Sequence, residues 1–310
     1  MPEGDFLKGE GCSDMAYVPS NPTDDTLFDY ETLKDIGKEL HAAYAAAEPF
    51  PHIAIDNFLS DDLVNLCLQK FPVRPDPDSQ TFDRDQERLK TSYHPDYMEP
   101  ALRRLFYAFN SRPFIKVVEN ITGIKGLIPD PYYLGGGFHE IGNGGHLSMH
   151  ADFNHHKPMD LERRINVLIY LNPDWKDEYG GQLELWRTDM SERVQSYLPV
   201  ANRCVMFTTT QQSMHGNPQP VAHPQGVTRK SIALYYYTST WDAAKASKTT
   251  QFRPRPGTGD QVDWQVKTSE ILSDFLPPIL NRQVARARRV WARLTAKSPA
   301  FTRPGRKARR

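Results

Sequence analysis

Between residues 132 and 238 the chain alternates short β-forming runs with turn residues, and no helical segment interrupts them. The runs are YYLGGGFHEI (132–141), INVLIYLN (165–172), GQLELW (181–186), RCVMFTTT (203–210) and SIALYYYT (231–238). Glycine, proline and asparagine separate them, as at 142–145 and 216–218. Short strands joined by such turns are typical of a sandwich or a barrel-like sheet.

The part of the chain before this β-rich region has helical periodicity. Leu33, Ile36 and Leu40, for example, recur at helical spacing. We predict helices over 29–47, 60–71, 99–110 and 113–121, and a strand over 49–59. Residues 73–95 lack apolar periodicity and are predicted to form a long surface loop. The expected fold class is mostly β with flanking α, in which a helical N-terminal layer packs on an antiparallel β-core.

Three regions are expected along the chain. Residues 1–27 are polar, with Gly, Pro and Asp punctuation, and are predicted to be a mobile leader. Residues 28–245 are expected to form one domain, whose β-core spans about 130–240. Residues 246–310 are expected to be a C-terminal extension with a basic helix and a disordered tail.

The C-terminal extension differs in charge from the rest of the chain. Residues 282–310 contain eleven Lys and Arg and no acidic residue, so residues 1–281 carry 27 basic and 38 acidic side chains. Apolar residues from Leu280 to Leu294 follow alternating steps of four and three, which predicts an amphipathic helix. This helix either docks on the domain or a second subunit, or meets an anionic surface such as a membrane or RNA.

Composition excludes several classes of protein. Three cysteines (Cys12, Cys67 and Cys204) are too few and too scattered for a disulfide framework or a cysteine-based zinc site. The N-terminal residues lack the apolar stretch of a secretory signal. No apolar run approaches the roughly 20 residues of a transmembrane segment. We therefore expect a cytoplasmic protein.

Histidine and aspartate concentrate in HLSMHADFNHH (146–156), after a predicted strand and a glycine turn. His150 and Asp152 are two residues apart, which on a strand puts both side chains on one face, roughly 6–7 Å apart along the chain. The best candidate for a third ligand is His215, which follows the strand predicted over 203–210. Two imidazoles and one carboxylate form the facial triad of non-haem Fe(II) oxygenases, which leaves coordination positions open.

Other histidines compete for this role. His139, His146, His155 and His156 lie close by, and we interpret the last two as surface or turn residues. His146 and His150 are four apart, as in a zinc-binding helix. The glycines before them and the sequence Asp-Phe-Asn after them argue against a helix here.

A possible carboxylate anchor lies fourteen residues after His215. Arg229 and Ser231 are two apart and share one face of a predicted strand. The planar fork of an arginine matches a carboxylate bidentately, and a neighbouring hydroxyl adds a donor. Tyr170 in the run 165–172 could add a phenolic donor. A dicarboxylate co-substrate needs such an anchor if its other end binds the metal.

The chain resembles the 2-oxoglutarate/Fe(II) dioxygenases of the prolyl-hydroxylase type, and it looks closest to bacterial proteins related to the ribosomal and hypoxia-sensing prolyl hydroxylases. The segments that carry the resemblance are GGHLSMHADFN (144–154), RRINVLIYLNPDWKDEYGGQLELW (163–186), NRCVMFTTTQQSMHGNPQPV (202–221) and RKSIALYYYT (229–238). Four separated segments in the family's order make it specific, and it covers about 49–240.

The resemblance implies a double-stranded β-helix (jelly-roll) with Fe(II) on His150, Asp152 and His215. It also implies that the far carboxylate of 2-oxoglutarate meets Arg229, with Tyr170 as a helper, and that L-ascorbate is an auxiliary reductant. The expected reaction consumes O₂ and 2-oxoglutarate, releases succinate and CO₂, and hydroxylates a substrate, for which a prolyl residue of a protein or peptide is one candidate.

One position departs from the family. Prolyl hydroxylases commonly have a tyrosine ten residues before the first ligand histidine, and here that residue is Glu140. A carboxylate would change the polarity of the pocket, which weakens the prolyl assignment and leaves the iron and co-substrate assignments intact. The segments 73–95 and 153–163 are candidate lids, and both are equally compatible with passive surface loops.

Three alternatives stay open. A zinc or other divalent-metal hydrolase or isomerase would keep the three ligands without needing Arg229 and Ser231. A non-catalytic jelly-roll module that binds glycan or peptide would not depend on His150. Within the enzyme class, the substrate could be a free amino acid, a lipid or a natural product rather than a protein.

Overall fold

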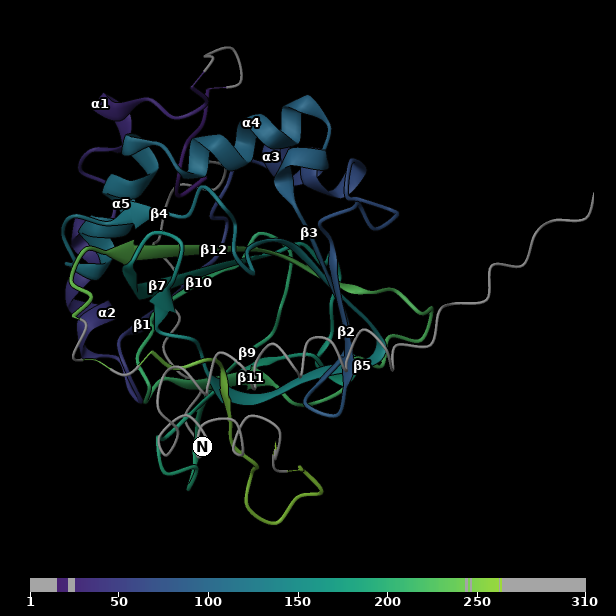
Figure 1. The fold of residues 1–310 in the computed structure, drawn as a ribbon. Helices are drawn as coiled ribbons and strands as arrows, with labels where there is room; N and C mark the ends of the chain where they lie inside the picture. The colour runs from purple at the N-terminus through teal and green to yellow at the C-terminus, as the bar shows by residue number, and fades with distance from the viewer. Residues whose placement is uncertain (1–15, 22–25, 243–244, 246, 262, 264–310) are drawn as a thin grey trace, which may run out of the picture. The chain divides into compact units, whose positions relative to one another are not determined.

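The computed structural model describes residues 16–21, 26–242, 245, 247–261 and 263, and an antiparallel sheet lies at the centre of this part. Its main order is β1-β10-β7-β12-β5-β11-β8-β9. The strands are β1 (His52–Ile55), β2 (Gln80–Arg84), β3 (Glu87–Tyr93), β4 (Ile128–Pro129), β5 (Gly137–Ala151), β6 (His155–His156), β7 (Leu161–Tyr170), β8 (Leu183–Trp186), β9 (Arg193–Tyr197), β10 (Cys204–Thr208), β11 (Met214–Asn217), β12 (Arg229–Thr238) and β13 (Gln251–Phe252). Figure 1 shows the sheet curling so that β12, β7 and β10 lie opposite β11 and β9. The predicted jelly-roll core is confirmed.

The long strand β5 joins the two halves of this curled sheet. Its first part, Gly137–Ile141, pairs with β12, whereas Leu147 and His150 near its end pair with β11. The strand bends between these parts at the glycine-rich stretch 142–145, where Gly144 has a φ of 84° that only glycine adopts freely. One strand therefore contributes to both walls of the interior.

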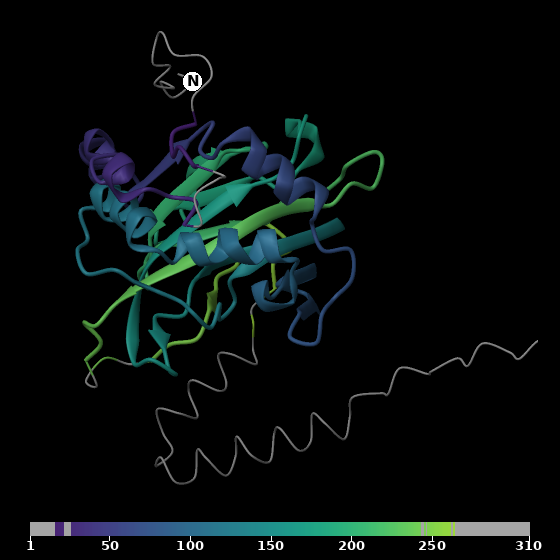
Figure 2. The same ribbon diagram turned by 90° about the horizontal axis from the view of Figure 1, so that it is seen from above.

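Helices cover the outer face of one half of the sheet. They are α1 (Tyr30–Leu33), α2 (His41–Ala46), α3 (Asp61–Gln69), α4 (Pro100–Phe109) and α5 (Arg112–Thr122). Figures 1 and 2 show α3 and α4 lying over β12. Alternate strand residues such as Ile165, Val167 and Ile169 pack outward against the helices in the main core. Their neighbours on β7 face the interior, as the two-residue period of a strand requires.

The helix predicted over 29–47 is interrupted in the structure. The chain forms α1, then a short 3₁₀ turn at Lys38–Leu40, then α2. The break lies at Gly37, whose φ is 93°. A Cβ at this position would come within 2.5 Å of Ile121 Cγ1 on α5. Close approach to α5 therefore requires glycine here, and periodicity alone does not reveal such a tertiary contact.

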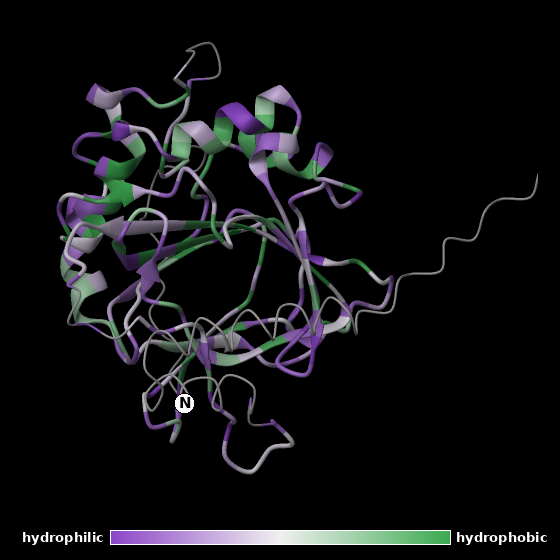
Figure 3. Cartoon of the chain, in the orientation of Figure 1, coloured by the Kyte–Doolittle hydropathy of each residue, from purple (hydrophilic) through white to green (hydrophobic). Residues whose placement is uncertain are grey.

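The segment 73–95 is not a surface loop, so this prediction was wrong. Residues within it form a β-hairpin, β2 and β3, and β3 pairs with β5 from Tyr93↔Phe138 to Glu87↔Leu147. The hairpin was missed because its side chains are mostly hydrophilic, as Figure 3 shows, so no apolar alternation reports a strand.

The predicted outer boundaries of the domain also differ from the packing. Val18, within the predicted mobile leader, is buried, and its N–H donates to Phe58 O at 2.8 Å. Past the predicted domain end at 245, β13 pairs with β5. The predicted basic helix and tail lie outside the described residues. No helix of the described segments is long and apolar enough to cross a membrane.

Phe114 on α5 connects the helical layer to the sheet, because its ring contacts those of Phe28, Phe58, Phe109 and Tyr236. Phe114→Ala is expected to lower the free energy of unfolding by about 3–5 kcal/mol, since it leaves a cavity in this cluster. Urea unfolding followed by circular dichroism measures the change. Val73→Ala, at a side chain that is 91% exposed, should change stability by less than about 0.5 kcal/mol. Equal effects of the two substitutions would contradict this account of the interface.

Candidate metal and co-substrate site

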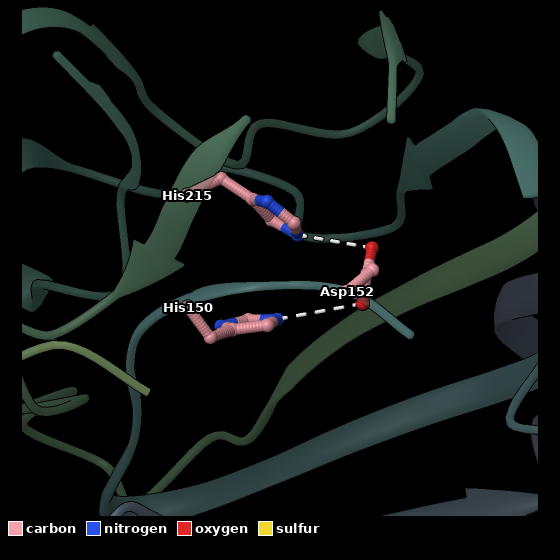
Figure 4. A group of neighbouring side chains, drawn as sticks. All are labelled: His150, Asp152 and His215. Atoms are coloured by element: carbon pink, nitrogen blue, oxygen red, sulfur yellow. Dashed lines mark ion pairs between the residues drawn. The ribbon is translucent and has the colours of Figure 1, made fainter. Parts of the chain in front are cut away.

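His150, Asp152 and His215 point toward one another in the interior of the sheet (Figure 4). Their ligand atoms all lie within 4.8 Å of one another, and this is the one such group of His, Cys, Asp and Glu in the described part of the chain. Asp152 Oδ1 lies 3.6 Å from His150 Nε2, and Asp152 Oδ2 lies 3.4 Å from His215 Nε2. The structure thus brings together the three residues that the sequence suggested as ligands.

Strand pairing explains how residues so far apart in sequence meet. His215 on β11 lies directly opposite His150 on β5 in an antiparallel pair. Asp152 follows immediately after β5 ends at Ala151. Opposite residues in such a pair have Cβ atoms about 4.5–5.5 Å apart, and the two imidazole centroids are 4.4 Å apart. The register of two strands therefore sets the spacing of the two histidines.

Both histidines are oriented by their own backbone. The Nδ1 of His150 is 2.8 Å from Ser148 O, and the Nδ1 of His215 is 2.9 Å from Ser213 O. A carbonyl oxygen can only accept, so each Nδ1 must donate a proton. Each neutral ring then presents the lone pair of Nε2 toward the group, which is the arrangement that metal-binding histidines adopt.

The Asp152 carboxylate is fixed through one oxygen. Its Oδ2 accepts a hydrogen bond from Asn166 Nδ2 at 2.7 Å and lies 3.1 Å from Arg163 Nη2. Burial raises the pKa of Asp152, but Arg163 and His215 outweigh it and hold the pKa well below its ordinary value. Asp152 is therefore a carboxylate, and Oδ1, which faces His150, is left to bind a metal.

Arg163 is itself buried beneath this carboxylate. Its guanidinium contacts the rings of Phe153 and Tyr235, with Cζ 4.4 Å and 3.6 Å from their centroids. It also donates from Nε and Nη2 to Asn166 Oδ1. A buried arginine with these contacts has little freedom to move. Sequence reasoning did not single out Arg163 or Asn166, although both lie in the segment 163–186 that carries the family resemblance.

A second polar group lies along the same cavity around Arg229, the first residue of β12. Arg229 is buried, and its Nε donates to Gly181 O at 2.7 Å. The Tyr170 ring lies beside its guanidinium, with Cζ 4.9 Å from the centroid. Ser231, also buried, lies opposite Tyr170 in the β12–β7 pair. The three residues that the sequence suggested for a carboxylate therefore share one region.

This second group has unused hydrogen-bonding capacity. The buried Tyr170 hydroxyl interacts with Arg229 and has no other hydrogen-bond partner among the described residues. Burial lowers the pKa of Arg229, and no carboxylate within the described residues forms an ion pair with it. Buried polar groups normally have partners, so this arrangement fits an anionic ligand. Gly181 permits it, because a Cβ there would come within 2.9 Å of Arg229 Cδ.

One cavity of about 600 Å³ is lined by the His150 group and by Arg229 and Ser231, whereas Tyr170 is in contact with Arg229 and is not among the lining residues. Leu168 and Leu183 form part of its wall near Arg229, and the hairpin residues Gln80, Phe82 and Arg84 form part of the wall on the other side. Its remaining walls come from β5, from the segment 153–158 and from residues 247–252. Of the two segments suggested as lids, both contribute residues that line the cavity, so that either could cover it.

Phe252 on β13 closes the cavity over the first histidine. It lies opposite His150 in the β13–β5 pair, and the two rings are 5.4 Å apart. Arg84 from β2 lies over the same phenyl ring at 5.2 Å. Sequence reasoning missed this contact, because two residues of strand outside the predicted domain carry no periodic signal.

The competing histidines have other partners. His146 Nε2 contacts Asp85 O, and His139 Nε2 contacts Gly135 O. His155 is hydrogen bonded to Asp160, but it also lines the cavity. His156, which we interpreted as a surface or turn residue, is fully buried and paired with Asp130 at 3.1 Å; that interpretation was wrong.

Glu140 does not line the cavity, so the expectation that it changes the polarity of the pocket was wrong. Its carboxylate accepts hydrogen bonds from Tyr93 and Thr228 on the outer face of β5. Leu147 and His150 are three residues apart on β5, but their partners on β11, Asn217 and His215, are only two residues apart. The strand β5 therefore contains one extra residue there. Such a bulge reverses which residues face inward. His139 and Ile141 line the cavity instead.

Residues 136–237 match the family model described as the 2OG-Fe(II) oxygenase superfamily. The matched segment runs from the start of β5 almost to the end of β12 and includes the His150 group and Arg229. Its donor set and its buried anion-binding groups fit Fe(II) and 2-oxoglutarate, respectively.

Three solved structures are similar to the chain. A prolyl hydroxylase from Trichoplax adhaerens, in complex with a hypoxia inducible factor oxygen degradation domain peptide fragment, is 18% identical, and the match covers 72% of this chain and 100% of that chain with a TM-score of 0.51. A prolyl-4-hydroxylase from Pseudomonas putida is 18% identical over 65% of this chain and 98% of that chain, with a TM-score of 0.45. HygX from Streptomyces hygroscopicus, with nickel and 2-oxoglutarate bound, is 12% identical over 72% of this chain and 92% of that chain, with a TM-score of 0.46.

The Trichoplax likeness shows a shared fold, and the family match identifies the chemistry of the segment from β5 to β12. The chain therefore carries a 2OG-Fe(II) oxygenase domain on a fold of the prolyl-hydroxylase type. It is a 2-oxoglutarate- and Fe(II)-dependent dioxygenase that hydroxylates a substrate.

Proposed function

We propose that His150, Asp152 and His215 hold the Fe(II) of this dioxygenase. The observation that carries the proposal is the convergence of two Nε2 atoms and one carboxylate within 4.8 Å. The carbonyls of Ser148 and Ser213 keep the Nε2 lone pairs directed at the metal position. Three protein ligands on one side leave the opposite side open for co-substrate and O₂.

We further propose that Arg229, Ser231 and Tyr170 bind the carboxylate of 2-oxoglutarate that is remote from the iron. Arg229 Nε is occupied by Gly181 O, which fixes the plane of the guanidinium and leaves its two terminal nitrogens for the carboxylate. The Tyr170 hydroxyl, which interacts with Arg229 and has no other hydrogen-bond partner among the described residues, adds a donor beside it. A fixed anchor at this end aligns the opposite end of the co-substrate with the His150 group.

When bound, iron and 2-oxoglutarate supply the oxidation, in which one oxygen atom of O₂ enters a substrate C–H bond and the other enters 2-oxoglutarate, which leaves as succinate and CO₂. The chain contributes position and exclusion of water. Leu168 and Leu183 line the cavity near the anchor, and Phe252 covers His150. Asn166 and Arg163 hold Asp152 ionised and oriented throughout.

We propose a residue of a protein or peptide as the substrate, with proline the first to test. The Trichoplax enzyme, whose fold this chain shares, is a prolyl hydroxylase seen with a peptide. The Glu140 carboxylate is no argument against a prolyl substrate, because it is hydrogen bonded to Tyr93 and Thr228 and does not line the cavity. Hydroxylation of a small molecule is the alternative, and a requirement for L-ascorbate stays a prediction.

Anaerobic addition of Fe(II) and 2-oxoglutarate should produce the metal-to-ligand charge-transfer band of a chelated co-substrate. The band should be lost in Asp152→Ala combined with His215→Ala, because one ligand cannot retain the iron. His146→Ala, at a histidine bonded to Asp85 O outside the group, is the matched control and should keep the band. A band that survives the double substitution would remove these ligands from the proposal.

Arg229→Ala should raise the 2-oxoglutarate concentration for half-maximal succinate release by about 10–100-fold, because a charge-assisted pair is lost. Lys230→Ala is a matched control on the same strand, since Lys230 faces outward and contacts Thr228 and Glu140. Its requirement for 2-oxoglutarate should be unchanged. If both variants behaved like the unmodified protein, the carboxylate anchor would have to be reassigned.

Asn166→Ala should weaken divalent metal binding by about 10–100-fold, because Asp152 Oδ2 loses a hydrogen-bond donor that orients it. Competition titration with Co(II) measures the affinity without turnover. Asn143→Ala, at an exposed position on β5, serves as the control. Unchanged metal affinity in Asn166→Ala would mean that Arg163 alone positions the carboxylate.

A further inference from the structure

The strand β11 and the residues after it connect the proposed metal ligands to the proposed carboxylate anchor along one wall of the cavity. Asn217 lies two residues after His215 on this strand, so both side chains share one face, and both line the cavity. Further along, Gln219 O accepts a hydrogen bond from Gly181 N at 3.1 Å, and Gly181 O accepts one from Arg229 Nε at 2.7 Å. Along this wall, Asn217 therefore comes between the ligands and the anchor.

The amide of Asn217 is buried and unsatisfied. The residue is 3% exposed, and its Nδ2 has no hydrogen-bond partner among the described residues. Gln182 Oε1, Thr209 Oγ1 and the Tyr237 hydroxyl are also buried without a partner in this part of the chain, but none of these residues lines the cavity. A buried donor without an acceptor destabilises a folded protein. A ligand in the cavity that supplies the acceptor removes this penalty.

On the neighbouring strands, the cavity-facing residues beside Asn217 are apolar. Asn217 lies opposite Leu147 in the β11–β5 pair, and Leu147 and Leu183 both line the cavity. A leucine, which branches at the same carbon as asparagine, would suit these surroundings better than an amide. Packing within the protein therefore does not explain a polar side chain at this position.

The chemistry of 2-oxoglutarate supplies an acceptor for this amide. The remote carboxylate is assigned above to Arg229, and the two methylene groups suit the apolar wall that Leu168 and Leu183 provide. At the other end, the carboxylate next to the keto group chelates the metal through one oxygen and leaves the second oxygen free. Two strand residues span roughly 6–7 Å, so Asn217 is near the His215 end of the cavity. Hydrogen bonds to a carboxylate are stronger than those between neutral groups.

We propose, on the basis of the oxygenase function above, that Asn217 Nδ2 donates a hydrogen bond to the free oxygen of the carboxylate next to the keto group of 2-oxoglutarate. Arg229 then holds one end of the co-substrate and Asn217 orients the other. Asn217 is thus a co-substrate-binding residue that recognises the 2-oxo acid, and it is not a metal ligand.

Anaerobic titration of the charge-transfer band with 2-oxoglutarate measures the affinity of the Fe(II)-loaded protein for its co-substrate. Asn217→Leu and Asn217→Ala should each raise the dissociation constant by about ten-fold or more, because a charge-assisted hydrogen bond is lost. Their affinity for Co(II) without 2-oxoglutarate should be unchanged, in contrast to Asn166→Ala. An unchanged dissociation constant in Asn217→Ala would overturn the proposal, since any effect of the larger leucine would then be steric.

The stability of the metal-free protein separates ligand binding from a structural role. Asn217→Leu should raise the melting temperature by about 2–4 °C, because an unsatisfied donor is removed from apolar surroundings. Thr209→Val is the matched control, since it removes an unpartnered buried hydroxyl outside the cavity, and it should leave the affinity for 2-oxoglutarate unchanged. A lower melting temperature in Asn217→Leu with unchanged 2-oxoglutarate affinity in Asn217→Ala would assign the amide a structural role instead.

A 2-oxo acid without the remote carboxylate locates the contact. 2-Oxopentanoate has the carbon chain and keto-acid end of 2-oxoglutarate but a methyl group in place of the remote carboxylate, so it can meet Asn217 without pairing with Arg229. Asn217→Ala should weaken its binding by the same factor as that of 2-oxoglutarate, and Arg229→Ala should not weaken it. If Asn217→Ala weakened the binding of 2-oxoglutarate alone, the amide would contact the remote carboxylate and the proposal would be wrong.

The charge-transfer band of the unmodified protein is recorded first, so that the two proposals are tested separately. Absence of this band would refute the proposed function. An intact band with unaltered affinities in the Asn217 variants would refute the present inference alone and leave the proposed function standing.

Discussion

The register between β5 and β11 is the constraint on which the site depends. His215 lies opposite His150 because these two strands pair at that residue. A slip of one residue would turn His215 to the other face of the sheet. Gly216 helps to fix the register, since a Cβ there would lie 2.8 Å from Leu147 O and 2.9 Å from Ser148 O. The approach of the strands that sets the distance between the ligands therefore requires a glycine beside one of them.

The carboxylate needs a different kind of support. Asp152 follows the end of β5, where strand pairing no longer fixes the side chain. Asn166 and Arg163 on β7 take over this role by holding one carboxylate oxygen. Removing one partner of a buried ion pair typically costs about 3–5 kcal/mol, because the other charge stays buried and unpaired. The position and charge of Asp152 therefore depend on the correct folding of β7.

The sequence predicts best those strands that bury apolar residues. The strands β7, β10 and β12 pack one face on helices and were found by their apolar runs. The hairpin β2–β3 faces the cavity with Gln80, Arg84 and Lys90, and β13 is two residues long. A strand that lines a polar cavity has no apolar face to reveal its period. The hairpin and β13, which the sequence did not predict, are therefore both strands that line the cavity.

Of the proposed ligands, His150 and Asp152 could be predicted from their local spacing and His215 from its place after a predicted strand, whereas Glu140 could not be placed by counting. Ten regular strand steps from His150 would turn Glu140 into the cavity, since residues an even number apart share a face. The extra residue between Leu147 and His150 reverses this parity, and Glu140 bonds outward to Tyr93 instead. His139 and Ile141 then form the wall. The pairing of β5 is irregular against both β11 and β3, and these irregularities, which the sequence does not reveal, help to decide which side chains line the cavity.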